Sequence, residues 1–356
     1  MKIGIIGLQN SGKTTIFNAL TGQDIEVTSY SSAKTEPNLG IVDVIDERVT
    51  RLSEMYEPKK TIYANIEYID FVGLTGSGNR KDAIPANVLA LAKTTDALAL
   101  VVRNFNDTEV IGDIDPLSDI DSIESELIIS DLIIAENRLG KIELSKKRGI
   151  KDAALMIEEK ALIKIIDQLN SDKSLRDLEL SSEEEKAVRG FQFISQKPLL
   201  IILNSDEDNF GANEELLNQI SEKYKVIEFA GNFEMELSKL PPEEAAEFME
   251  DMNISESARD RLTKFSYEIL GYLSFFTVGK DEVRAWTITK GQNAVEAAGK
   301  IHSDLARGFI RAECFSYDDL METGSEKAIK EKGHFRLEGK NYIVKDGDIL
   351  NIRFSV

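Results

Sequence analysis

The segment Gly7–Thr14 constrains the fold of this chain more than any other. It reads GLQNSGKT and matches the pattern G-x-x-x-x-G-K-[S/T] in full. Glycines allow the backbone to turn its N–H groups toward one point, where they can bind an anion. An apolar run over 2–7 precedes the segment and a helix-like run over 13–20 follows it. The pattern therefore predicts a strand, a phosphate-binding loop and a helix whose positive N-terminal end faces the phosphates.

Two side chains of this loop are expected to act on a bound triphosphate. Lys13 can reach the β- and γ-phosphates, and the Thr14 hydroxyl can hold Mg²⁺. We therefore predict catalytic roles for Lys13 and Thr14. The predicted phosphate-binding residues are Asn10, Ser11, Gly12, Lys13, Thr14 and Thr15.

A phosphate-binding loop also needs a carboxylate for the metal, at the end of a neighbouring strand. The run IEYIDFVGL supplies Asp70 and, in a D-x-x-G spacing, Gly73. Asp70 is expected to support the Mg²⁺ shell, and the Gly73 N–H to meet the γ-phosphate, which makes Gly73 the third predicted catalytic residue.

Residues that bind the nucleotide base are expected at the end of a later strand. In most GTPases this position holds N-K-x-D, whose aspartate accepts from guanine. Here the run reads NSDE, so Ser205 replaces the lysine and Glu207 the aspartate after Asn204. A longer carboxylate without the flanking lysine should weaken guanine recognition, and adenine presents a different edge, so the sequence argues against specificity for GTP. The remaining predicted base-site residues are Ser205, Ala230 and Gly231.

The composition restricts the class of protein. The chain has 356 residues, a formal net charge of −20 and one cysteine. This length predicts two or three domains, and the single cysteine fits a reducing cytoplasm. The sequence predicts neither a signal peptide nor a membrane span. The net charge disfavours DNA and other non-specific nucleic-acid binding. Residues 276–356, however, hold 13 Lys/Arg and 13 Asp/Glu, which leaves an RNA contact at that end open.

Three regions follow one another along the chain. Strands and helices alternate over 1–120 and resume over 197–275, which predicts an α/β nucleotide-binding domain with a parallel sheet. An acidic helical insertion over 121–196 predicts a helical hairpin. That hairpin is interpreted either as a packing arm or as a partner-binding arm. Within it, Ser182 and Glu185 form a capping-box pattern.

The last region, 276–356, predicts a small α+β domain. The run EVRAWTI reads as a strand, and 293–309 reads as one helix with Asn293 as its N-cap. The run NYIVKDGDILNIRFSV reads as two strands around an Asp-Gly turn.

These segments together resemble the YchF subfamily of Obg-type P-loop nucleotidases over essentially the whole chain. The resemblance rests on GLQNSGKTTIFNALTG, TEPNLGIVDVIDERVTRL and NSDE. It is strongest in FFTVGKDEVRAWTITKGQNAVEAAGKIHSDLARGF and RLEGKNYIVKDGDILNIRFSV. It implies a Ras-like P-loop domain with an inserted helical hairpin, plus a C-terminal TGS domain of β-grasp type.

The resemblance also implies an activity. Family members bind ATP at least as well as GTP through N-x-x-E, hydrolyse slowly with Mg²⁺ and associate with ribosomes. On this basis Asn204 and Glu207 would read the base, Ser205 would lie against it, and Asn10 would help bind K⁺. The expected partners are ATP or GTP and the ribosome or its RNA.

The chain departs from the family pattern at both nucleotide-sensing segments. Lys34 stands where the family has a metal-binding threonine, and Thr35 follows one residue late, so Thr35 is the predicted third metal residue beside Thr14 and Asp70. At the second segment, the family's glycine-rich, lysine-containing run is replaced by TGSGNRKDAIPANVL, in which Pro85 stiffens the loop. Leu74, which follows the D-x-x-G spacing, is apolar as in the family and cannot orient water. We therefore expect a slow Mg²⁺-dependent ATPase or GTPase switch in translation. The alternative is a hydrolysis-deficient nucleotide sensor that binds the ribosome or RNA through the helical arm and TGS domain.

Overall fold

The computed structural model describes residues 1–25, 37–71, 86–106, 114–149, 152–251 and 256–355. The chain forms two compact units, and each is described by itself. We call residues 1–40 and 67–259 the P-loop unit, and residues 41–66 and 260–356 the C-terminal unit. None of the helices within the described ranges combines the length and hydropathy of a membrane span.

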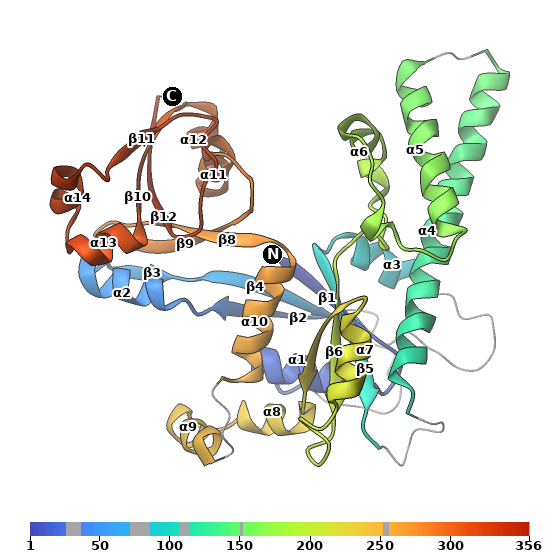
Figure 1. Ribbon diagram of the computed structural model, residues 1–356, viewed down its shortest axis with the longest axis horizontal. Coiled ribbons are helices and arrows are strands. Elements are labelled where there is room, and N and C mark those ends of the chain that lie inside the picture. Colours follow the sequence, from blue (N-terminus) through green and yellow to red (C-terminus); the bar gives the residue numbers. More distant parts are fainter. Residues whose placement is uncertain (26–36, 72–85, 107–113, 150–151, 252–255, 356) are drawn as a thin grey trace. The chain divides into compact units, whose positions relative to one another are not determined.

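A six-stranded sheet forms the centre of the P-loop unit (Figure 1). Its order is β2-β4-β1-β5-β6-β7. The strands are β1 Lys2–Ile6, β2 Asn38–Val44, β4 Ala64–Asp70, β5 Ala97–Asn104, β6 Leu199–Ser205 and β7 Lys225–Phe229. The pairs β1–β4, β1–β5, β5–β6 and β6–β7 are parallel. The predicted α/β class is thereby confirmed.

Helices lie in the connections between strands of this sheet, as parallel pairing requires. Among them are α1 Lys13–Thr21, α3 Ala86–Lys93 and α7 Glu214–Ser221. Helices α8 Gly231–Leu237 and α9 Pro242–Asp251 follow β7, the last strand of the sheet along the chain. Every residue of β6 is buried, which explains why the sequence there is a continuous apolar run and not an alternating one. Because the strands run in parallel, their carboxyl ends meet at one edge, where ligands bind in open α/β sheets.

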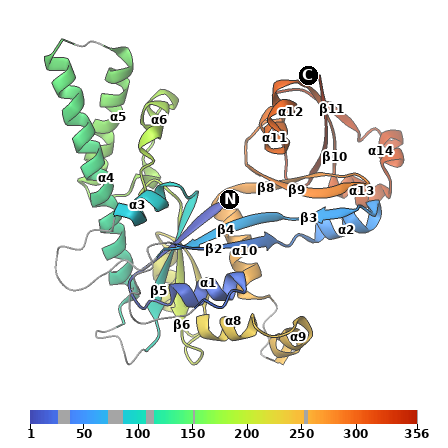
Figure 2. The same cartoon turned by 180° about the vertical axis from the view of Figure 1, so that it is seen from behind.

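The predicted helical hairpin is confirmed. Helices α4 Pro116–Lys147 and α5 Ala153–Leu169 lie side by side (Figures 1 and 2). They bury a shared apolar cluster that includes Ile128, Ala135, Ile142, Ala161, Leu162 and Ile165. The capping box predicted at Ser182 and Glu185 was placed one residue too late. Ser181 and Glu184 form it, at the start of α6 Ser182–Val188.

A buried carboxylate joins the hairpin to the start of β6. Asp131 of α4 is fully buried, and its two oxygens accept from the N–H groups of Ile194 and Ser195 at 3.0 and 2.7 Å. Ile194 and Ser195 are themselves fully buried, so these N–H groups have no access to water. Asp131 therefore supplies the hydrogen-bond acceptors that water or a neighbouring strand would otherwise provide for this stretch of backbone.

The C-terminal unit has its own six-stranded sheet, in the order β11-β10-β12-β8-β9-β3. The strands are β3 Lys60–Ile62, β8 Tyr272–Thr277, β9 Glu282–Thr289, β10 Phe309–Ser316, β11 Arg336–Glu338 and β12 Asp348–Phe354. The helices are α2 Glu47–Tyr56, α10 Ala258–Ile269, α11 Ala294–Ile301, α12 Ser303–Arg307, α13 Tyr317–Thr323 and α14 Glu326–Lys332.

Two local predictions for this unit need correction. Asn293 caps α11 as predicted, but the single helix over 293–309 is two helices, because His302 is extended and its Nδ1 accepts from the Asp304 N–H to start α12. The first strand before the Asp-Gly turn is absent from the described structure, where Ile343 forms one isolated bridge to Asn293. It cannot pair with β12, because β10 and β8 already occupy both edges of that strand.

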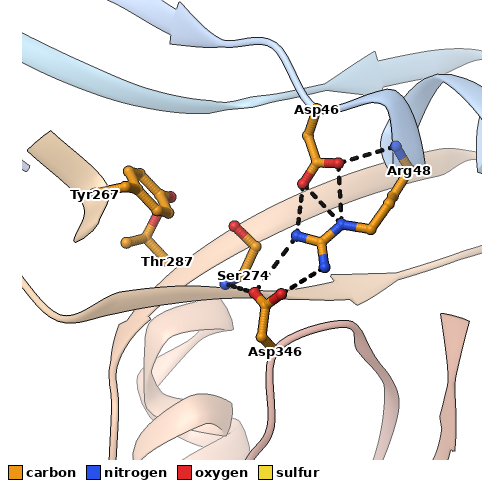
Figure 3. A network of polar contacts seen from close by, with 6 residues as sticks. All are labelled: Asp46, Arg48, Tyr267, Ser274, Thr287 and Asp346. Atoms are coloured by element: carbon orange, nitrogen blue, oxygen red, sulfur yellow. Dashed lines mark hydrogen bonds and ion pairs between the residues drawn. The ribbon is translucent and has the colours of Figure 1, made fainter. Parts of the chain in front are cut away.

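Residues 41–66 were predicted within the nucleotide-binding domain, but in the structure they group with the C-terminal segment. Strand β3 pairs in parallel with β9. The Arg48 guanidinium donates to Asp46 Oδ2 at 2.8 Å and to Asp346 Oδ2 at 2.6 Å (Figure 3). Asp346 Oδ1 in turn accepts from the Ser274 N–H at 2.9 Å. The contact between Arg48 and Asp346 joins segments 298 residues apart, which no local pattern encodes.

Beside this network, the hydroxyls of Tyr267 and Thr287 are hydrogen-bonded to each other (Figure 3). Tyr267 belongs to α10 and Thr287 to β9. This contact therefore fixes α10 against the sheet of the C-terminal unit.

The single cysteine should be inert in the native protein. Cys314 is fully buried, and burial, reinforced by the Asp348 carboxylate, raises the pKa of its thiol to about 12. Because the thiolate is the reactive form, we expect no reaction of the folded protein with a thiol reagent at pH 8. One equivalent should react in guanidinium chloride. Rapid labelling of the native protein would contradict this.

Candidate functional site

The phosphate-binding loop has the backbone that the sequence predicts. It lies between β1 and α1, with Gly12 at φ 88° as the N-cap of α1 and Asn10 at φ 59°. A Cβ on Gly12 would stand 2.1 Å from the Asn204 Nδ2 atom, so glycine is required here by both conformation and space. Thr15 and Ser11 are buried in the same turn.

Lys13 points its ammonium group back into the loop. The side chain is only 7% exposed, and its Nζ atom donates to the Leu8 carbonyl oxygen at 2.6 Å. Burial lowers the pKa of Lys13 to about 8, against the opposing attraction of Asp70. The ammonium group is therefore poorly solvated, and the negative charge of a nearby phosphate would compensate for the hydration that burial has removed.

Asp70 ends β4 next to this loop. It is 3% exposed, and its Oδ2 accepts from Thr14 Oγ1 at 3.0 Å and from Asn38 Nδ2 at 3.2 Å. Its Oδ1 is buried and has no hydrogen-bond partner among the described residues. Burial raises the pKa of Asp70, while Lys13, Asn38 and Thr14 favour its ionised form.

This donor set fits Mg²⁺. A carboxylate and a hydroxyl are hard oxygen ligands, and an unpartnered buried carboxylate oxygen is the atom that a hydrated cation would satisfy. Within the described ranges, no group of three or more His, Cys, Asp or Glu side chains could hold a metal ion by itself. Mg²⁺ is usually held by one or two protein oxygens together with substrate phosphates.

Asn204 connects the base motif to the phosphate loop. It lies at the end of β6, is 4% exposed, and donates from Nδ2 to the Ser11 carbonyl oxygen at 3.1 Å. Its Oδ1 accepts from the Gly231 N–H at 3.1 Å. A Cβ on Gly231 would lie 2.6 Å from that same oxygen, so the first residue of α8, after the Ala230 N-cap, must be glycine. Asn204 thus ties three predicted site segments together.

The two residues after Asn204 differ in exposure. Ser205 is 3% exposed, and its hydroxyl donates to Glu228 Oε1 at 2.7 Å and accepts from Asn104 Nδ2 at 3.0 Å. Glu207 is exposed in the turn that follows β6. The exposed Glu207 carboxylate could therefore accept a hydrogen bond from a nucleotide base. The Ser205 hydroxyl is instead bonded to other side chains of the protein.

Sequence reasoning missed two residues of this region. Asn38 is the last residue of the run TEPN. Its position three residues after Thr35, in the first nucleotide-sensing segment, could have suggested a role at the metal site. Glu228 lies one strand beyond the base motif and carried no local signal. The predicted residues Thr35 and Gly73, together with Lys34, Leu74 and Pro85, lie outside the described residues.

Two family models match the chain. A family described as "50S ribosome-binding GTPase" matches residues 2–138. A C-terminal family of YchF GTPases, described as a protein of unknown function, matches residues 272–355. The matches lie at opposite ends of the chain, as the resemblance implied.

Full-length relatives are also similar to the chain. A protein of Bacillus subtilis (strain 168) named "Ribosome-binding ATPase YchF" is 39% identical over 363 residues, covering 99% of both chains. One of the same name from Escherichia coli O157:H7 is 38% identical over 363 residues, covering 100% of this chain and 99% of the other. The solved structure of the Schizosaccharomyces pombe YchF GTPase has 30% identity and a TM-score of 0.84, covering 99% of this chain and 97% of that one.

Proposed function

Because the chain belongs to the YchF family, we propose that it is a Mg²⁺-dependent P-loop nucleotide hydrolase that works slowly on ATP, GTP or both and associates with ribosomes. The observation that carries the proposal is the Asp70 carboxylate, which binds the Thr14 hydroxyl and keeps one buried oxygen without a partner in the described part of the chain. A buried acceptor of this kind beside a phosphate loop is costly unless a ligand satisfies it.

The roles of the residues follow from their positions. Lys13 leaves the Leu8 carbonyl and donates to the β- and γ-phosphates, while the loop N–H groups and the start of α1 bind the same oxygens. Thr14 and Asp70 hold Mg²⁺, which neutralises charge on the phosphate oxygens when bound. Asn204 holds the phosphate loop in a fixed position relative to the base site through its hydrogen bond to the Ser11 carbonyl, and Glu207 accepts a hydrogen bond from the base. Two residues of the nucleotide-sensing segments complete this proposal: Thr35 as a further Mg²⁺ ligand and Gly73 as the N–H that meets the γ-phosphate.

Water attack must proceed without a glutamine after the D-x-x-G spacing, since this position is Leu74. The proposed rate is accordingly low, roughly 10⁻⁴ to 10⁻² per second for a switch nucleotidase without an activating group. Asn10 supports K⁺ as an additional activating cation, and turnover that is equal in KCl and NaCl would count against it. Leu74 and Lys34 also favour the second candidate function, a nucleotide sensor without hydrolysis.

The Asn38 amide should determine how tightly Mg²⁺ is held. Its Nδ2 donates to Asp70 Oδ2 at 3.2 Å, and Asp70 Oδ1, which has no partner among the described residues, would remain available to Mg²⁺. In Asn38→Ala, we expect the Mg²⁺ concentration that half-saturates ATP binding to rise about tenfold, as for other partners of metal-binding carboxylates. Equilibrium titration of a fluorescent ATP analogue with Mg²⁺ measures this.

Two controls accompany the Asn38 measurement. Gln23→Ala removes a nearby hydrogen bond, from Gln23 Nε2 to the Leu39 carbonyl at 3.0 Å, and should leave the Mg²⁺ titration unchanged. ATP binding in EDTA should be the same in Asn38→Ala as in the wild type. An unchanged Mg²⁺ requirement in Asn38→Ala would show that Asn38 does not orient Asp70.

The base preference is tested by titration with ATP, GTP and their diphosphates. Glu207 replaces the shorter aspartate of N-K-x-D, so we expect ATP to bind at least as tightly as GTP. A preference for GTP of about tenfold, which is about 1.4 kcal/mol, would overturn this assignment.

Ribosome association is supported by the names of the relatives and by exposed basic side chains of the C-terminal unit. These are Lys290, Lys300, Arg307 and Arg311. The proposed partner is the ribosome or its RNA, in the cytoplasm, with no membrane or DNA partner. Co-sedimentation of the full chain with ribosomes in the presence of ATP tests this, and recovery only in the supernatant would contradict it. Deleting 276–356 is not a suitable control, because β9 within it pairs with β3.

A further inference from the structure

A buried glutamate beside the base motif has no role in the function proposed so far. Glu228 lies in β7 and is 9% exposed. Its Oε1 accepts from Ser205 Oγ at 2.7 Å and from Asn213 Nδ2 at 2.6 Å, and its Oε2 accepts from the Gly211 N–H at 3.1 Å. One carboxylate therefore satisfies three donors, and hydrogen bonds to an ionised acceptor are the stronger kind.

The three donors come from the two ends of one turn. Ser205 is the last residue of β6, whereas Gly211 and Asn213 lie just before α7. Within the turn, the Asn209 N–H donates to Asp206 Oδ1 at 2.9 Å and the Phe210 N–H donates to the Asp206 carbonyl at 3.0 Å. The Asn213 amide also bonds to Ser205 Oγ at 3.3 Å, which joins the two ends directly. Glu228 adds a contact from β7 whose single carboxylate binds both ends of the turn.

This turn carries Glu207, the exposed carboxylate at the base site. The same end of β7 also leads to Gly231, whose N–H holds Asn204. The end of one strand thus sets the position of Asn204 and of the turn after it. If the turn were not held, its ordering would oppose binding of the base, because fixing a mobile segment costs conformational entropy.

We propose that Glu228 is a positioning residue for the purine: it holds the turn that presents Glu207, and so governs affinity for the base but not for the phosphates. The inference rests on the proposed function. The phosphate contacts are separate from it, since Lys13, Asp70 and Asn38 form their hydrogen bonds without Glu228. Base affinity and phosphate affinity should therefore respond differently when Glu228 is changed.

Glu228→Gln tests this with little change of side-chain volume. The substitution removes the charge and turns an NH₂ group toward a donor of the turn. We expect the affinity for ATP to fall about tenfold, and the affinity for inorganic tripolyphosphate to stay within about twofold of the wild type. Both ligands are titrated by calorimetry with the full chain in the presence of Mg²⁺.

Matched variants separate this role from a general loss of structure. Glu67→Gln changes a carboxylate of β4 that bonds to Lys2 at 3.2 Å, and both affinities should match the wild type. Asn213→Ala removes one donor of the same carboxylate, so adding it to Glu228→Gln should cause no further loss of ATP affinity beyond about twofold.

Each outcome is decisive. Equal losses of ATP and tripolyphosphate affinity in Glu228→Gln would show a merely structural role, and unchanged ATP affinity would show no role at all. Either result would overturn the inference while leaving the proposed function intact. A wild-type chain that binds neither ligand would overturn the proposed function, and this inference with it.

Discussion

Lys13→Ala should weaken binding of Mg²⁺-ATP about 100-fold or more. Lys13 carries the buried ammonium group of the phosphate loop, which donates to the Leu8 carbonyl oxygen. A triphosphate would replace that single neutral acceptor with several charged oxygens. Removing one charged donor from a water-poor phosphate site costs about 3 kcal/mol, which corresponds to about 150-fold in affinity.

The effect is measured by titrating ATP into both proteins by calorimetry. Lys2→Ala is the matched control, because Lys2 lies in β1 before the same loop but forms a partly exposed ion pair with Glu67. Exposed pairs contribute less than about 1 kcal/mol, so ATP affinity should not change in this variant. Equal affinities of Lys13→Ala and the wild type would place the nucleotide elsewhere.

Asp131→Ala should cause the largest loss of stability among the changes considered. It would leave the N–H groups of Ile194 and Ser195 without an acceptor, at a place where both residues are fully buried. Each unsatisfied buried donor costs about 1 to 3 kcal/mol, so we expect a total loss of about 3 kcal/mol. The loss should be local, since it affects the junction of α4 with the segment before β6.

Native-state hydrogen exchange measures the loss at the affected amides. The Ile194 and Ser195 N–H groups should exchange about 150-fold faster in Asp131→Ala, which corresponds to about 3 kcal/mol. Asp131→Asn keeps one acceptor and should show a smaller effect. The control is Asp121→Ala in the same helix, where the side chain is 75% exposed. Unchanged exchange in Asp131→Ala would mean that water replaces the carboxylate.

The sequence predicted the backbone positions of those parts of the candidate site that depend on local patterns. The loop from Gly7 to Thr14 encodes its own conformation, because its glycines, lysine and following helix are contiguous. Asp70 and Asn204 could be predicted because each ends an apolar strand, and the ends of parallel strands meet. The resemblance added Glu207 as the base reader, which stays a prediction.

The parts that escaped prediction depend on distant partners. Glu228 lies on β7 and binds Gly211, which is 17 residues earlier in the chain. Asn38 of β2 meets Asp70 of the neighbouring strand β4, 32 residues later. The place of residues 41–66 depends on Arg48 meeting Asp346, near the other end of the chain. The capping-box pattern was ambiguous as well, because Ser181 and Ser182 are adjacent and a glutamate lies three residues after each. The position at which α6 begins shows that Ser181 is the N-cap.

The central claim is that this site both binds and cleaves a nucleoside triphosphate. Sensitive detection of phosphate released from ATP with Mg²⁺, for the wild type and for Lys13→Ala, tests it most directly. We predict slow release by the wild type, roughly 10⁻⁴ to 10⁻² per second, and none above background by Lys13→Ala. Wild-type release that is indistinguishable from that of Lys13→Ala would contradict the claim and leave a nucleotide sensor in its place.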